Sequence, residues 1–119
     1  MIDLSNYKEG DNLGTIYVVY DFGDCYEIIT EKHEGCVLTT LEVGKYTTNY
    51  CVEDNLGKTV CSWYGSAPHW GTKVDEVYFS LDDACNAYKK ILEGRIGKLS
   101  KEIAEYKKIV LYGLKDAFK

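Results

Sequence analysis

Long apolar runs and an excess of positive charge are both missing from this sequence. No run approaches the roughly 18–20 apolar residues that a membrane-spanning helix needs, so no membrane segment is expected. The 119 residues carry 14 Lys and Arg against 19 Asp and Glu, which gives a formal net charge of −5. Nucleic-acid binders need positive charge to displace counterions. We therefore expect no direct contact with nucleic acid.

Catalytic and cofactor motifs are missing as well. The chain has no phosphate-binding loop, no dinucleotide glycine pattern and neither of the hydrolase motifs HExxH and GxSxG. Residues 1–5 lack the basic and apolar regions of a signal peptide. These absences predict a non-enzymatic protein of the cytoplasm that carries no cofactor.

Cysteine is present, but not in a pattern typical of a metal site. The five cysteines, at positions 25, 36, 51, 61 and 85, include no CxxC pair. Together with His33 and His69 they could supply four zinc ligands, but the gaps are long and irregular, whereas structural zinc sites usually take two ligands from one tight knuckle. An odd count without an export signal favours free, largely buried thiols. We expect five free cysteines and no bound metal.

The first two thirds of the chain follow a β pattern. Apolar residues make up 45% of the chain and aromatic residues 13%, which is enough for a real core. Turn residues recur about every ten positions between β-branched or alternating segments, as in small antiparallel barrels and sandwiches. The pattern predicts strands over residues 15–21, 25–32, 36–43, 46–52, 58–64 and 74–79, with turns at 21–24, 33–35, 44–45 and 53–57.

The tetrapeptide Asp-Asn-Leu-Gly occurs twice, at 11–14 and 54–57, each time just before a predicted strand. Asp and Asn side chains bond to nearby backbone groups, and glycine allows positive φ. We interpret both copies as turns; an ancient duplication is the alternative.

Ser80 begins the helical part of the chain. Ser80-Leu81-Asp82-Asp83 fits a capping box, and the two aspartates favour the positive end of the helix dipole. Apolar residues then recur at gaps of three and four, and this register continues through Gly94 and Gly97. The pattern predicts a single helix from about 81 to 116. A kink or break at the glycines is the alternative, because each costs about 1 kcal/mol in a helix interior.

The fold class that follows is α+β. We expect a small antiparallel β-barrel or strongly bent sheet of five or six strands, followed by a long C-terminal helix. The β domain should cover residues 1–79 and the helix residues 80–119, as one folding unit. An open sheet with the helix lying across one face is the alternative.

An apolar stripe follows one side of the predicted helix. A β domain of about 75 residues is roughly 25 Å across, whereas a helix of about 35 residues is about 50 Å long, so part of the helix should extend beyond the domain. We therefore expect a homodimer built chiefly by this stripe; packing on the β domain of the same chain is the alternative. The stripe residues show an a/d-like heptad repeat and are Leu92, Ile96, Leu99, Ile103, Tyr106 and Val110.

Residues 62–75 interrupt the β pattern and combine aromatic residues with Gly, Ser and the only proline, Pro68. Rigid aromatic side chains lose little entropy on binding and often dominate interfaces. The candidate partner-binding residues are therefore Trp63, Tyr64, His69 and Trp70. The alternative is that the tryptophans plug the open end of a small barrel.

Carboxylates are concentrated in the first predicted hairpin, at Asp21, Asp24, Glu27, Glu31 and Glu34. An inhibitor that competes with nucleic acid would present such a surface. An ordinary solvated surface would look the same, so the cluster does not choose between the two.

Two stretches carry a resemblance to a known group. The first is KEGD at 8–11, leading into IYVV at 16–19. The second combines LGKTV at 56–60 with VYFSLDDA at 77–84, and residues 61–76 stand between its two parts. These stretches resemble small proteins of phages and prophages of Gram-positive bacteria, in which an SH3-like β-barrel precedes a C-terminal helix. In that group the two parts of the second signature are usually fused.

The resemblance implies a phage or prophage protein, and small phage proteins of this size and acidity include inhibitors of bacterial defence, such as anti-CRISPR proteins. We therefore expect a non-enzymatic binding protein that inhibits a host defence effector by protein–protein contact. One alternative is a structural or adaptor homodimer. Another is a protein that sequesters a nucleotide signal, although the chain has only one arginine, Arg95, to hold phosphate.

Overall fold

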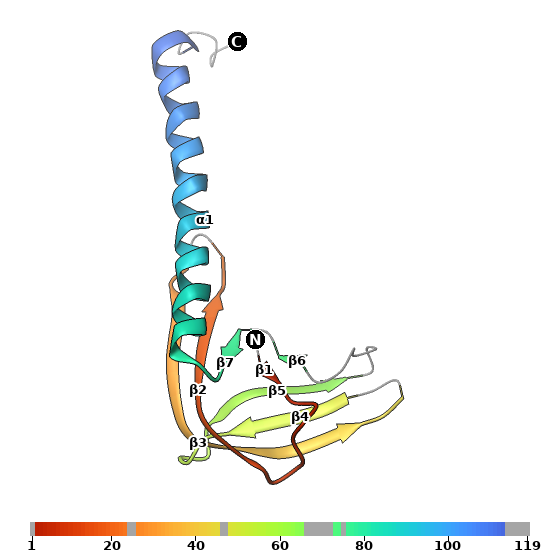
Figure 1. Cartoon of the computed structure of the whole chain (residues 1–119). Helices are drawn as coiled ribbons and strands as arrows, with labels where there is room; N and C mark the ends of the chain where they lie inside the picture. The colour runs from red at the N-terminus through yellow and green to blue at the C-terminus, as the bar shows by residue number, and fades with distance from the viewer. Residues whose placement is uncertain (1, 24–25, 46–47, 66–72, 75, 114–119) are drawn as a thin grey trace. The chain divides into compact units, whose positions relative to one another are not determined.

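The computed structural model describes residues 2–23, 26–45, 48–65, 73–74 and 76–113 (Figure 1). The chain divides into two compact units, Met1–Asn86 and Ala87–Lys119. The strands all belong to the first unit, and the boundary lies within the helix that follows them.

Seven strands are found in the described part of the first unit. Five of them form an antiparallel sheet in the order β5-β4-β3-β2-β7, and the short strands β1 and β6 pair separately. Their bounds are β1 (Ile2–Asp3), β2 (Asn12–Asp21), β3 (Ile28–Val43), β4 (Thr48–Glu53), β5 (Thr59–Gly65), β6 (Lys73–Val74) and β7 (Val77–Tyr78).

The predicted α+β class is confirmed, but the predicted barrel is wrong because the sheet is open. Its edges are β5 and β7, which do not pair with each other in the described residues. Strand β3 pairs with β2 through its first part and with β4 through its second, and the two partners overlap only at Val37. Closing a barrel requires every strand to pair on both sides. Here β2 and β4 overlap along β3 at one residue only, and the edge strand β7 is two residues long. The sheet therefore cannot close.

The turn predicted at 33–35 is also wrong, because these residues lie inside β3. Gly35 there has a φ of 59°, and Gly14 on β2, which pairs with Cys36, has a φ of 72°. The register between the two strands shifts on both sides of Gly14. Glycine at positive φ inside a strand marks a β-bulge, which bends a strand without ending it. The two strands predicted over 25–32 and 36–43 are therefore one bent strand of 16 residues, as Figure 1 shows.

The two ends of the β region also differ from the prediction. The single strand expected over 74–79 consists of β6 and β7, with Glu76 at a φ of 73° before β7. The N-terminal segment, where the sequence pattern predicted no strand, contributes β1 and two core residues, Ile2 and Leu4. The buried core cluster consists of Ile2, Leu4, Leu13, Ile16, Cys36, Leu38, Val52 and Val77.

Helix α1 (Leu81–Lys108) continues through Gly94 and Gly97, as predicted. The Ser80 hydroxyl accepts a hydrogen bond from the Asp83 backbone N–H at 3.4 Å, so the cap also lies where the sequence placed it. The α-helix ends at Lys108 and is followed by a π-helix, η1 (Ile109–Gly113), whereas residues 114–116 lie outside the described residues. In the described part of the chain, no helix is both long and apolar enough to cross a membrane.

Replacing Gly94 and Gly97 together by Ala should stabilise α1 by about 1 kcal/mol per site. An added Cβ meets nothing within 4 Å at either position, and Ala has less backbone entropy to lose than Gly. Thermal unfolding followed by circular dichroism should show a higher melting temperature. Gly10→Ala is the matched control: its Cβ also has open space, but a φ of 90° makes Ala unfavourable there. A melting temperature that falls in the double variant would contradict this expectation.

Candidate functional site

The apolar stripe of α1 and η1 is open to solvent. Its six residues have exposed fractions between 39%, at Leu92, and 64%, at Tyr106 and Val110. Contiguous apolar surface of this kind usually marks an interaction site, because folded proteins rarely leave it uncovered. All six residues that the sequence assigned to dimerisation therefore lie on an accessible apolar surface. Their role in dimerisation stays a prediction.

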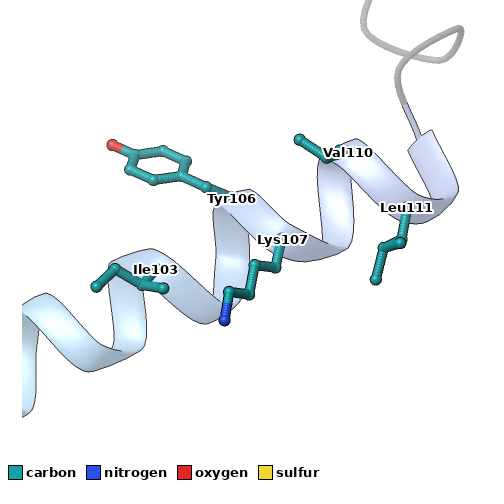
Figure 2. Close-up of a pocket in the computed structure, with 5 residues that line it drawn as sticks. All are labelled: Ile103, Tyr106, Lys107, Val110 and Leu111. Carbon is teal, nitrogen blue, oxygen red and sulfur yellow. The ribbon is translucent and has the colours of Figure 1, made fainter.

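A shallow hollow lies at the C-terminal end of the stripe. Figure 2 shows its five lining residues, with Tyr106 and Val110 projecting to one side of the helix and Lys107 and Leu111 to the other. Ile103 completes the lining. Ligand pockets for small molecules enclose most of the ligand surface. A hollow lined by residues of one continuous helical segment does not enclose a ligand in this way. Its lining includes a single cationic side chain, Lys107, that could contact a phosphate.

The aromatic partner-binding residues lie only partly within the described structure. Trp63 and Tyr64 belong to β5, an edge strand of the sheet, where they pair with Tyr50 and Asn49 of β4. The Trp63 side chain is 41% exposed. His69 and Trp70 lie outside the described residues. The alternative, that the tryptophans plug the open end of a barrel, required a closed barrel, and the sheet is not closed.

A buried histidine cluster, which the sequence did not predict, joins β3 to the turn between β4 and β5. His33 is 5% exposed. Its Nδ1 lies 2.8 Å from Asp54 Oδ2, and its Nε2 lies 2.8 Å from Glu31 Oε2. Lys58 Nζ lies 3.5 Å from the same Glu31 oxygen. Both ring nitrogens of His33 therefore lie at hydrogen-bond distance from a carboxylate oxygen.

Asp54 also organises its own turn. Its Oδ1 accepts hydrogen bonds from the Leu56 and Lys58 backbone N–H groups, both at 2.9 Å. The hydrogen bond from His33 lowers the pKa of Asp54, and these two N–H groups lower it further, while burial opposes the shift. The Asn55 N–H donates to the Glu34 carbonyl at 3.1 Å, which attaches the turn to β3 beside the bulge. Both ring nitrogens of His33 are engaged, and the cluster ties the turn between β4 and β5 to β3.

Two of the described thiols, Cys36 and Cys61, are poorly suited to nucleophilic chemistry. Cys36, Cys51, Cys61 and Cys85 are free, and Cys25 lies outside the described residues. Burial raises the pKa of Cys61 to about 12, with Cys51 and Cys36 adding to the effect. Burial also raises the pKa of Cys36. The thiolate is the reactive form, so such groups react slowly. In the described ranges, no group of three or more His, Cys, Asp or Glu side chains is placed to hold a metal ion.

Comparison with known proteins does not place the chain in a family. No protein-family model, curated protein or solved structure matches it. The resemblance to small phage proteins therefore rests on the short stretches at 8–19, 56–60 and 77–84 alone.

Proposed function

We propose that this chain is a non-enzymatic protein-binding protein, in which α1 joins two copies and the segment at the end of β5 contacts a protein partner. The exposed apolar stripe of α1 is the observation that carries this proposal. Fully burying a large apolar side chain contributes about 1.5–3 kcal/mol. Six such residues on one helix therefore favour contact with another protein chain.

The partner that we propose is an effector of a bacterial defence system, which the chain inhibits as a phage or prophage protein in the bacterial cytoplasm. The resemblance of the stretches at 8–19, 56–60 and 77–84 to small phage proteins supports this partner. The net charge of −5 and the fully engaged His33 ring fit an inhibitor that acts by contact and not by catalysis.

A structural or adaptor homodimer is the second candidate, and the same stripe favours it, because dimerisation needs no further partner. The two candidates differ in what the aromatic segment, which holds Trp63, Tyr64, His69 and Trp70, does. An inhibitor needs this segment to contact a host protein, whereas an adaptor homodimer keeps its function when the segment is changed.

Replacing Trp63 and Trp70 together by Ala should abolish partner binding and leave the melting temperature within a few degrees of wild type. Trp63 is already 41% exposed, so its truncation removes contact area that a partner would cover. Binding is measured as affinity capture from a bacterial lysate, and inhibition as protection of phage in a plaque assay. Tyr26→Ala, which truncates an aromatic residue 67% exposed elsewhere in the unit, is the matched control.

Two outcomes would count against the aromatic segment as a binding site. A double variant that melts far earlier, yet still captures its partner at low temperature, would assign the tryptophans to stability. A variant that captures the same protein and protects phage as wild type does would place the partner contact outside the two tryptophans. Wild-type protein that captures no host protein and does not protect phage would leave the adaptor homodimer as the better candidate.

A further inference from the structure

We infer that α1 pairs with α1 of a second copy as a parallel, in-register, two-stranded coiled coil. The inference rests on the proposed joining of two copies by α1, and it adds the orientation and register of that contact. It follows from which residue types occupy the two kinds of seam position and from the charges beside them.

The seam positions of α1 have different residue types at a and at d. Gaps of four and three along the stripe place Ile96, Ile103 and Val110 at a. The d positions are Leu92, Leu99 and Tyr106. β-Branched residues at a with leucine at d favour two parallel strands, because of the way each side chain enters the hole on the facing helix. Five of the six seam residues follow this rule, and Tyr106 is the exception.

The seam has a defined start and end. The a position that precedes Leu92, three residues earlier, is Lys89, which pairs with Glu93 at 3.9 Å on its own helix. Beyond Tyr106, η1 begins at Ile109 and replaces the α-helical period on which a heptad depends. The regular heptad register therefore runs from Leu92 to Tyr106, and Val110 continues the apolar stripe within the first residues of η1. Gly94 and Gly97 fall at f and b, which face away from a partner helix.

The charges beside the seam favour the parallel orientation. Parallel, in-register helices bring each g residue beside the e residue five positions later on the partner copy. Glu102 lies at g and Lys107 at e, so opposite charges meet twice in one dimer. In an antiparallel pair whose two stripes overlap fully, the two-fold axis that relates the copies passes near residue 101. Such a pair would gain contacts between Lys107 and Glu93, but it would set the two Glu102 side chains beside each other.

The area of the seam is large enough for a stable dimer. Burying a large apolar side chain contributes about 1.5–3 kcal/mol, which at about 25 cal/mol per Å² corresponds to about 60–120 Å² of buried surface. The twelve seam residues of two copies therefore bury on the order of 1,000 Å², which reaches the size of a specific protein interface. Exposed fractions of 39–64% leave this area accessible to a second copy.

Cysteine cross-linking tests the orientation directly. The parent protein carries Cys25→Ser and Cys85→Ser, and Tyr106→Cys or Ile96→Cys is added singly. In the parallel arrangement each new cysteine faces its own copy, so mild oxidation should give disulfide-linked dimers of either variant alone on a non-reducing gel. Lys101→Cys, at the outward f position, is the matched control and should stay unlinked.

Three other outcomes would overturn the inference, in ways that can be told apart. Residues 96 and 106 are about 15 Å apart along the axis, so an antiparallel dimer should link the two variants only when they are mixed. A dimer in which neither variant links, alone or mixed, would have another seam. Light scattering of the parent that gives a monomer mass at micromolar concentrations would reject the joining of two copies itself.

Discussion

Leu99→Glu combined with Ile103→Glu is expected to convert the dimer into monomers. Both residues lie in the middle of the stripe, with exposed fractions of 57% and 53% in the single chain. The double variant would place four carboxylates in the buried apolar seam of one dimer. An unpaired buried charge costs several kcal/mol, and each 1.4 kcal/mol weakens association about tenfold. We therefore expect dimerisation to weaken by at least about 1,000-fold.

Light scattering across micromolar concentrations measures this change as a fall from twice the chain mass to the chain mass. Gly97→Glu with Ala104→Glu is the matched control, since it adds the same charge to α1 at two b positions that face away from the seam. That variant should remain a dimer. A Leu99→Glu, Ile103→Glu variant that keeps the mass of a dimer would reject the stripe as the interface.

The helix was the part of the fold that could be predicted most closely from the sequence. Its signals are local: Ser80 supplies the cap, and the apolar spacing continues in phase on both sides of Gly94 and Gly97. A helix satisfies its backbone hydrogen bonds within four residues, so local signals are sufficient. The change to a π-helix at Ile109 had no such signal in the sequence.

The sheet was harder to predict because its bend depends on residues that are distant in sequence. His33, Glu34 and Gly35 have the composition of a turn, and only the pairing of Gly14 with Cys36 shows that the strand continues as a bulge. The length of the edge strands decides whether a sheet closes. Here β7 is two residues long, and no pattern in residues 74–79 marks the positive φ of Glu76 that precedes it.

The candidate site shows the same division between local and distant signals. The six stripe residues could be named from their spacing alone. The His33 cluster could not, because its carboxylates come from Glu31, two residues away, and Asp54, 21 residues away. The one usable signal was the second Asp-Asn-Leu-Gly turn. It correctly indicated that Asp54 bonds to nearby backbone groups, but it gave no sign that the other carboxylate oxygen of Asp54 contacts a buried histidine.

His33→Gln is expected to destabilise the β unit by more than about 2 kcal/mol, because removing the buried imidazole leaves two carboxylates without their hydrogen-bond partner. Asp54 Oδ2 and Glu31 Oε2 each lose a partner at 2.8 Å. Urea unfolding at fixed protein concentration measures the change. Lys32→Gln is the matched control on the same strand: it removes a cation from an ion pair with Glu34 whose side chains are 57% and 63% exposed. Exposed pairs contribute little, so this variant should stay within about 0.5 kcal/mol of wild type.

The acid side of the stability curve gives a second measure of the same cluster. The folded pKa of Asp54 is lowered from the ordinary value of 3.8, chiefly by His33. Ionised Asp54 therefore stabilises the fold at pH values above 3.8, and this contribution is lost as the pH falls below 3.8 towards its folded pKa. In His33→Gln the pKa of Asp54 should return towards 3.8, so the loss of stability in acid should be smaller than in wild type. Equal acid sensitivity in the two proteins, with equal unfolding midpoints in urea, would mean that His33 does not hold this turn.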